Sequence, residues 1–154
     1  MHDHQLAPKH IEPYMMSPRP GRRAGAVMTL HNEATDCWIT LRFRRPMDSS
    51  GQPFSAVMVD LLGAGHLGDY GFIGSFKQGQ LIISTKFKGS KDSAVKARKA
   101  IQWVLYRIHQ GKDLATVRVL HEGVCGRCGK TLTRPDSIDN GLGPDCFKIV
   151  NKKS

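Results

Sequence analysis

The chain has 154 residues, of which 40% are hydrophobic and 23% charged, values typical of one globular domain or of one small domain with an appendage. No apolar run is long enough to cross a bilayer, and the first residues lack the apolar core of a secretion signal, so we expect a soluble, cytoplasmic protein with no membrane contact. Lysine and arginine outnumber aspartate and glutamate by 23 to 13, and the resulting net charge of +10 favours binding to a polyanion such as nucleic acid.

Residues 1–25 contain four prolines and a loose basic cluster of Arg19, Arg22 and Arg23. They show no helical or strand period in their apolar residues. We therefore expect a flexible basic arm over residues 1–25.

From residue 26 the pattern changes to short β-branched and aromatic segments separated by Gly, Pro, Asp and Ser. Six such segments are predicted strands: residues 26–32, 37–45, 54–62, 70–76, 80–88 and 115–120. Apolar residues at helical spacing predict one amphipathic helix within residues 93–111, which ends at Gly111. The predicted fold class is α+β, with a mostly antiparallel sheet of five to six strands and one packed helix over residues 26–120, followed by a small treble-clef-like zinc module over residues 121–154.

A glycine-rich stretch follows the third predicted strand and has the spacing Gly63-x-Gly65-x-x-Gly68. A dinucleotide site requires a helix directly after these glycines. Here Asp69 begins a turn and another strand, so we interpret the stretch as a hairpin loop and expect no bound cofactor there.

Two surfaces are candidates for contacts with nucleic acid. On the predicted helix, the side opposite the apolar stripe carries Lys96, Lys99, Trp103, Tyr106 and Arg107, a mixture suited to stacking on bases and neutralising phosphates. The alternative is that another part of the protein covers Trp103.

The second surface depends on strand alternation. Arg42 and Arg44 share one face of their strand, and Lys86 and Lys88 share one face of theirs. If these strands are neighbours, the four side chains form a basic sheet face, and otherwise they belong to ordinary solvated faces.

The C-terminal stretch holds three of the four cysteines. Cys125 and Cys128 form a Cys-x-x-Cys pair, and Cys146 follows a Gly-Pro helix start, where free backbone N–H groups favour a thiolate. His121, four residues before Cys125, is the predicted fourth ligand of a Zn²⁺ site, ahead of three less favoured candidates: Cys37, His66 and His109. A redox dithiol is the competing interpretation of the Cys-x-x-Cys pair, and Cys37 is expected to be a core residue.

The run from Cys125-Gly-Arg-Cys128-Gly through Leu132-Thr133, Pro135, Ser137-Ile138 and Gly141 to Gly143-Pro144-Asp-Cys146 resembles the signature of an uncharacterised zinc-finger-like family. That family occurs in phage, plasmid and actinobacterial proteins. The resemblance implies a phage or mobile-element origin, hence a host bacterial cytoplasm, and supports the three cysteines as ligands. It implies no function.

Three functions remain open. The favoured one is a non-enzymatic nucleic-acid-binding protein, with DNA more favoured than RNA, whose Zn²⁺ module contributes phosphate contacts from Arg127, Lys130 and Arg134. The alternative is a module that binds or inhibits a host enzyme or defence complex through Trp103 and Tyr106. The least favoured is a zinc-dependent hydrolase with Glu122 as base, which would require that His121 is not a ligand.

Overall fold

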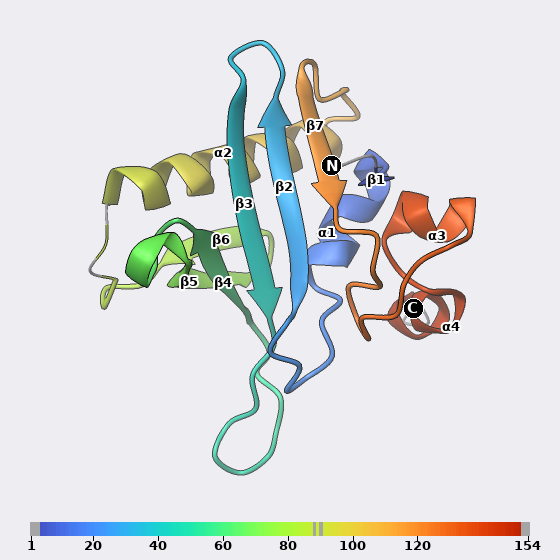
Figure 1. The fold of residues 1–154 in the computed structure, drawn as a ribbon, viewed down its shortest axis with the longest axis horizontal. Helices are drawn as coiled ribbons and strands as arrows, with labels where there is room; N and C mark the ends of the chain where they lie inside the picture. The colour runs from blue at the N-terminus through green and yellow to red at the C-terminus, as the bar shows by residue number, and fades with distance from the viewer. Residues whose placement is uncertain (1–3, 88, 90, 152–154) are drawn as a thin grey trace.

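The computed structural model describes residues 4–87, 89 and 91–151. Over these residues, the elements in chain order are β1 (His4–Gln5), the 3-10 helix η1 (Pro8–His10), α1 (Ile11–Met15), β2 (Ala26–Asn32), β3 (Cys37–Arg44), β4 (Val57–Leu62), the 3-10 helix η2 (His66–Gly68), β5 (Tyr70–Lys77), β6 (Gln80–Ile83), α2 (Lys91–His109), β7 (Val117–His121), α3 (Pro135–Asn140) and α4 (Pro144–Val150). Figure 1 shows their arrangement. No helix in the described part of the chain is long and apolar enough to span a membrane.

The strands form one antiparallel sheet in the order β1-β7-β2-β3-β4-β5-β6. The predicted α+β class is confirmed, with seven strands among the described residues instead of five or six. The additional strand is β1, in which His4 pairs with His121 and Gln5 with Leu120 of β7. Two residues are too few to show an alternating pattern in a sequence, so this strand could not be predicted.

The predicted hairpin loops are also present. At the β5–β6 turn, Gln78 and Gly79 both have positive φ, at 53° and 78°, which is the conformation that a two-residue turn between twisted strands requires. The glycines at 63–68 connect the antiparallel strands β4 and β5, so no βαβ unit surrounds them. The interpretation of this stretch as a hairpin loop is confirmed.

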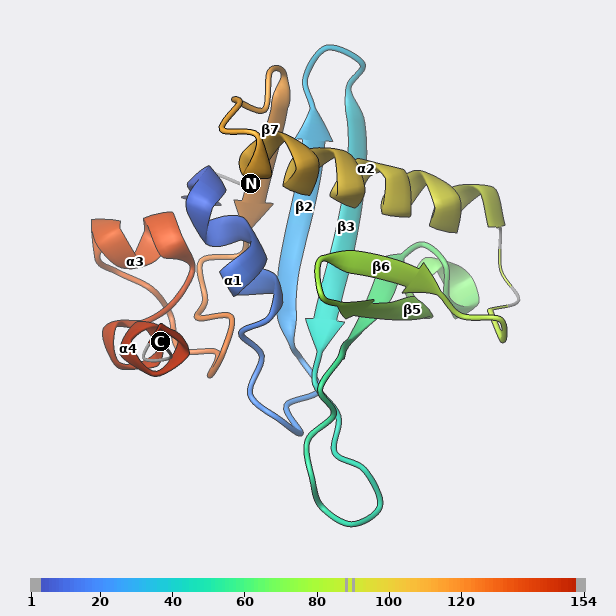
Figure 2. The same ribbon diagram turned by 180° about the vertical axis from the view of Figure 1, so that it is seen from behind.

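Helix α2 covers one face of the sheet. It crosses in front of β2 and β3 in Figure 2 and behind them in Figure 1. Five of the six residues of the predicted stripe are buried: Ala94, Ala97, Ile101, Val104 and Leu105. The sixth, Ile108, is partly buried and packs against the same core. They pack with inward-facing strand residues such as Leu41, Phe43 and Val59 in one core, whose apolar area removed from water stabilises the fold.

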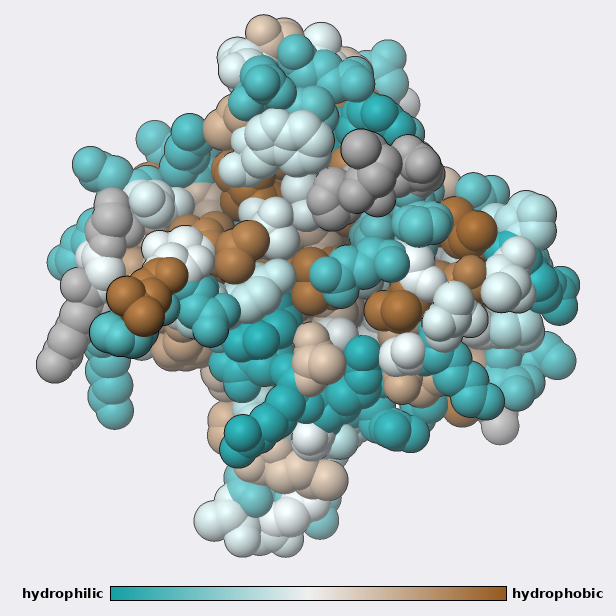
Figure 3. Space-filling view, viewed as in Figure 1, coloured by the Kyte–Doolittle hydropathy of each residue, from teal (hydrophilic) through white to brown (hydrophobic). Residues whose placement is uncertain are grey.

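Among the described elements, no helix covers the opposite face of the sheet (Figure 1), and hydrophilic residues run along its middle (Figure 3). Arg42 and Arg44 lie on this face and both donate to the carboxylate of Asp60 on β4, with Arg42 Nε at 2.8 Å and Arg44 Nη2 at 2.7 Å from its oxygens. Asp60 is only 2% exposed, so the arginines compensate a buried charge.

The predicted basic sheet face is therefore not formed. Strands β4 and β5 separate β3 from β6, so Arg42 and Arg44 are not beside Lys86, which lies exposed beyond the end of β6. Lys88 is outside the described residues. The prediction that these two strands are neighbours is wrong because strand order depends on tertiary pairing, which alternation within each strand does not reveal.

Residues 4–17 pack into the protein instead of extending from it as part of the expected flexible arm, whose first three residues are outside the described ones. Leu6, Ile11, Tyr14 and Met15 are each at most 1% exposed and belong to the main core. Tyr14 also donates a hydrogen bond to the carbonyl of Val27, at 3.0 Å. Leu6 lies between β1 and η1, and the other three lie in the short helix α1. So few apolar residues, separated by prolines, show no period in the sequence.

Candidate metal centre

Three cysteines come together at the C-terminal end of the fold. Cys125 and Cys128 lie in the loop after β7, and Cys146 lies in the first turn of α4. Their three Sγ atoms are all within 4.8 Å of one another, and no other His, Cys, Asp or Glu of the described residues joins the group. Three thiolates at this spacing could hold one metal ion.

The loop that carries Cys125 and Cys128 is a tight knuckle. The N–H of Cys125 donates to the carbonyl of Lys130 at 2.7 Å, and the N–H of Gly129 donates to the carbonyl of Cys125 at 2.9 Å. Gly129 has φ +88°, a conformation that side chains other than glycine rarely adopt. The chain therefore reverses its direction between Cys125 and Lys130.

Cys146 is positioned by the start of α4. Gly143 is the extended residue before the helix and Pro144 its first residue, as the sequence predicts. The backbone N–H groups of this turn have no partner within the helix, and they give the first turn a partial positive charge. That charge favours an anionic sulfur at Cys146.

Electrostatics distinguish the thiols. At Cys125, burial opposes ionisation, but hydrogen bonds from three backbone N–H groups outweigh it and lower the pKa of the thiol; the donors are those of Gly143, Cys128 and Arg127. At Cys146, burial raises the pKa to about 11, although Arg127 Nη1 lies 3.7 Å from its sulfur and acts in the opposite direction. Cys125 therefore ionises before Cys146, and a bound cation would favour the thiolate form of its ligands.

His121, the predicted fourth ligand, is not brought to the cysteines. Its ring is 1% exposed, its Nε2 is 2.7 Å from the carbonyl oxygen of Ile138, and its Nδ1 accepts the N–H of Gly123 at 2.9 Å. Since the carbonyl can only accept, the proton lies on Nε2, and both ring nitrogens are occupied by the backbone. The histidine lies at the end of a strand as predicted, but its hydrogen bonds hold the backbone of Gly123 and Ile138 together. It belongs to no metal cluster in the described residues.

The less favoured candidates also lie apart from the cysteine cluster. Cys37 is half-buried on β3, His66 is exposed in η2, and His109 lies 3.3 Å from a carboxylate oxygen of Glu12. None of them belongs to a group of metal-binding side chains among the described residues.

A cavity of about 380 Å³ opens beside Cys128 and Cys146. We call it the basic hollow because four cations line it: Arg19, Arg127, Lys130 and Arg134. The sequence indicated Arg127, Lys130 and Arg134 as phosphate contacts, and the fold adds Arg19, whose backbone N–H donates to the carbonyl of Arg127 at 3.2 Å. Asp145 is the one carboxylate that lines the hollow, and Arg134 is also paired with Asp136 at 3.1 Å.

The other predicted contact residues lie on α2. Trp103 is 39% exposed, so no part of the described chain covers it completely, and Lys96 and Lys99 are exposed on the same side. The guanidinium of Arg107 lies 5.4 Å from the centre of the Trp103 ring and pairs with Asp113. Among the described residues, the predicted contacts thus occupy four separate places: the basic hollow, the α2 side, the Asp60 cluster and Lys86 beyond β6.

The cysteine module is similar to a known family. Residues 116–150 match the sequence profile of a family of unknown function (DUF6011). This match contains all three clustered cysteines and His121. No curated protein and no solved structure shows significant similarity to the chain.

Proposed function

We propose that the protein is a non-enzymatic nucleic-acid-binding protein whose cysteine module holds one structural Zn²⁺. Three thiolates are soft ligands of the kind that Zn²⁺ favours, with water or a group outside the cluster as the fourth ligand. The module has a small core of its own, Cys125, Leu132, Leu142 and Cys146, so it depends on the ion for part of its stability.

The basic hollow is the observation that carries the binding proposal. Its four cations come from two segments that are far apart in the sequence, Arg19 in one and Arg127, Lys130 and Arg134 in the other, and their positions depend on the knuckle that the ion would fix. One carboxylate among them leaves a net positive charge, suited to phosphate oxygens. The overall charge of +10 adds long-range attraction for the same partner.

A hydrolytic role is the weaker alternative. Glu122, the base suggested by the sequence, is exposed and does not line the basic hollow, where the available carboxylate is Asp145. Three anionic sulfurs also reduce the positive charge with which the ion could acidify a bound water.

Fluorescence anisotropy on labelled single- and double-stranded DNA and RNA tests the binding proposal, and each titration is repeated at several salt concentrations. The affinity of the zinc-loaded protein should fall steeply with salt, because phosphate binding releases counterions. The double variant Arg19→Glu/Lys130→Glu should weaken binding to the preferred nucleic acid and reduce the slope of log K against log salt by about 1–2.

The matched control is Lys9→Glu/Lys77→Glu, which makes the same change in net charge at exposed positions away from the basic hollow. If both double variants weakened nucleic-acid binding equally, the effect would come from net charge alone, and the basic hollow would not be the binding site. No salt-dependent binding to any of the four nucleic acids would refute the proposed function.

A further inference from the structure

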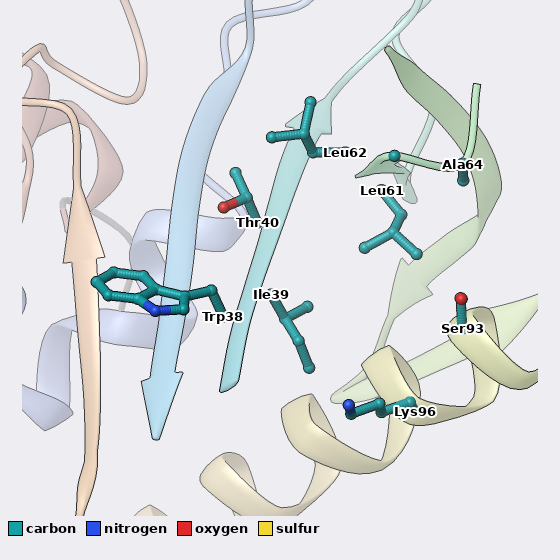
Figure 4. A pocket seen from close by; sticks show the side chains of 9 residues that line it. Trp38, Ile39, Thr40, Leu61, Leu62, Ala64, Ser93 and Lys96 are labelled. Atoms are coloured by element: carbon teal, nitrogen blue, oxygen red, sulfur yellow. The ribbon is translucent and has the colours of Figure 1, made fainter. Parts of the chain in front are cut away.

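A second concave surface follows the exposed side of α2 and is separate from the basic hollow. A cavity of about 740 Å³ lies between this helix and the strands β2, β3 and β7, and its walls include Leu30, Ile39, Ala100, Trp103 and Val117. A smaller one of about 290 Å³ lies beyond it, lined by residues such as Leu61, Ala64 and Ser93 (Figure 4). Ile39 and Lys96 line both, so the two cavities adjoin each other, and we call them together the α2 groove.

The α2 groove is apolar along its floor and cationic at its edge. Its floor is formed by inward-facing strand residues next to the helix. Its edge carries Lys96 and Lys99, which are exposed and form no ion pair with any residue that the structure describes. In Figure 4, Ile39 points from β3 toward α2, on which the side chain of Lys96 lies. Asn32 and Thr116 add polar atoms at the far end.

Trp103 is held in place at this edge. Arg107 lies 5.4 Å from the centre of its ring, and that arginine is itself fixed by Asp113, whose carbonyl accepts from Arg107 Nε at 2.8 Å. An indole that is 39% exposed and braced in this way loses little freedom when a flat ring stacks on it. An apolar groove with a stacking platform, and with two cations that form no ion pair with the described residues, matches an occupant that has flat apolar faces and repeated negative charges.

We propose that the α2 groove binds the unpaired bases of a single-stranded nucleic acid. Bases lie against Trp103 and the apolar floor, and the backbone phosphates lie toward Lys96 and Lys99. A duplex cannot use the groove in this way because its base faces are stacked inside the helix and paired. The inference rests on the proposed function and specifies it, since the basic hollow alone makes no distinction between single and double strands.

Cys37 provides a test that needs no substitution. It lines the α2 groove, it is half-buried, and it is the one cysteine outside the clustered three. In the zinc-loaded protein, the rate of its alkylation by N-ethylmaleimide is followed by peptide mass spectrometry. Saturating oligothymidylate of about 12 nucleotides should slow this rate severalfold, whereas a duplex at the same concentration should leave it unchanged.

Trp103→Leu gives an independent measurement by anisotropy. It should weaken oligothymidylate binding about tenfold or more, because stacking on an aromatic side chain supplies that much affinity per base. The matched control is Phe72→Leu, which removes an aromatic side chain of similar exposure, 41%, that lines neither the α2 groove nor the basic hollow. Thermal melting confirms that both variants are folded.

The outcomes separate the two proposals. Binding that is unaffected by Trp103→Leu and leaves Cys37 equally reactive would overturn the groove inference while the nucleic-acid proposal stands on the basic hollow. Protection of Cys37 by an acidic aromatic peptide such as poly(Glu,Tyr), and not by oligothymidylate, would overturn it in favour of a protein occupant. No binding to any nucleic acid would remove both proposals.

Discussion

Replacement of His121 by alanine separates a structural histidine from a metal ligand. The ring is buried between His4 and Tyr14, at centroid distances of 5.4 Å and 5.8 Å, and it bonds the backbone of Ile138 and Gly123 at 2.7 Å and 2.9 Å. Loss of each bond leaves a backbone group without its partner, at a cost of about 1–2 kcal/mol. With the cavity left by the ring, we expect His121→Ala to lower the free energy of unfolding by about 3 kcal/mol and Tm by about 6–12 °C.

The metal content of the same sample provides the second measurement. His121→Ala should retain one metal ion per chain at a temperature where it is still folded, because the three cysteines are unchanged. His109→Ala, with a mainly exposed side chain, should change neither stability nor metal content appreciably and serves as the control. If His121→Ala lost its metal while circular dichroism showed an intact fold, His121 would be a ligand and the reasoning from its hydrogen bonds would be refuted.

Four further predictions follow from other contacts. Cys128→Ser should bind well below one metal ion per chain, whereas Cys37→Ser should still bind one. Inductively coupled plasma mass spectrometry measures the metal content of both variants. Equal metal content in the two would exclude Cys128 as a ligand. Gly126→Ala places a methyl group 2.7 Å from both Tyr14 Cε1 and Ser17 Oγ and should lower the free energy of unfolding by about 1–3 kcal/mol, measured by urea unfolding. Gly143→Ala, with no atom within 4 Å of the new carbon, should lower it by less than about 1 kcal/mol, the loss expected because alanine is a poorer N-cap than glycine. Equal losses would contradict the packing at Gly126. Asp60→Ala leaves Arg42 and Arg44 without their carboxylate and should lower the free energy of unfolding by about 2 kcal/mol. This loss is smaller than for a fully buried ion pair because both guanidinium groups are about a quarter exposed. An unchanged Tm would show that the three residues contribute nothing to stability. Burial lowers the pKa of His121 below its usual 6.5, so the unfolded chain binds more protons than the folded one, and the free energy of unfolding should fall as pH drops below about 6.5. In His121→Ala, the free energy of unfolding should fall less steeply between pH 7 and pH 5. Parallel curves for the two proteins would refute this contribution.

The cysteine cluster could be predicted from the sequence because the determinants are local. Two residues between Cys125 and Cys128 allow one tight turn, and Gly143-Pro144 begins the helix that carries Cys146. His121 could not be assigned from spacing alone. Its imidazole can reach either the knuckle or the backbone, and the carbonyl of Ile138, 17 residues further along the chain, decides between them.

The remaining differences arise from contacts between distant segments. The N-terminal segment has no periodic pattern, yet Tyr14 and Met15 fill the core because short elements place them there. Arg42 and Arg44 were expected to face phosphates, but the strand order sets them beside Asp60. The α2 groove depends on where one helix crosses the sheet, so the sequence indicated Lys96, Lys99 and Trp103 without indicating the apolar floor below them.

The most direct test of the account is native mass spectrometry of the purified, untagged protein with and without a chelator. We predict one zinc ion per chain, and loss of the C-terminal fold, seen as rapid hydrogen exchange over residues 124–150, when the chelator removes it. Purified protein that holds no stoichiometric metal, and whose exchange over these residues does not change in chelator, would contradict the claim that three cysteines bind the ion that stabilises this module.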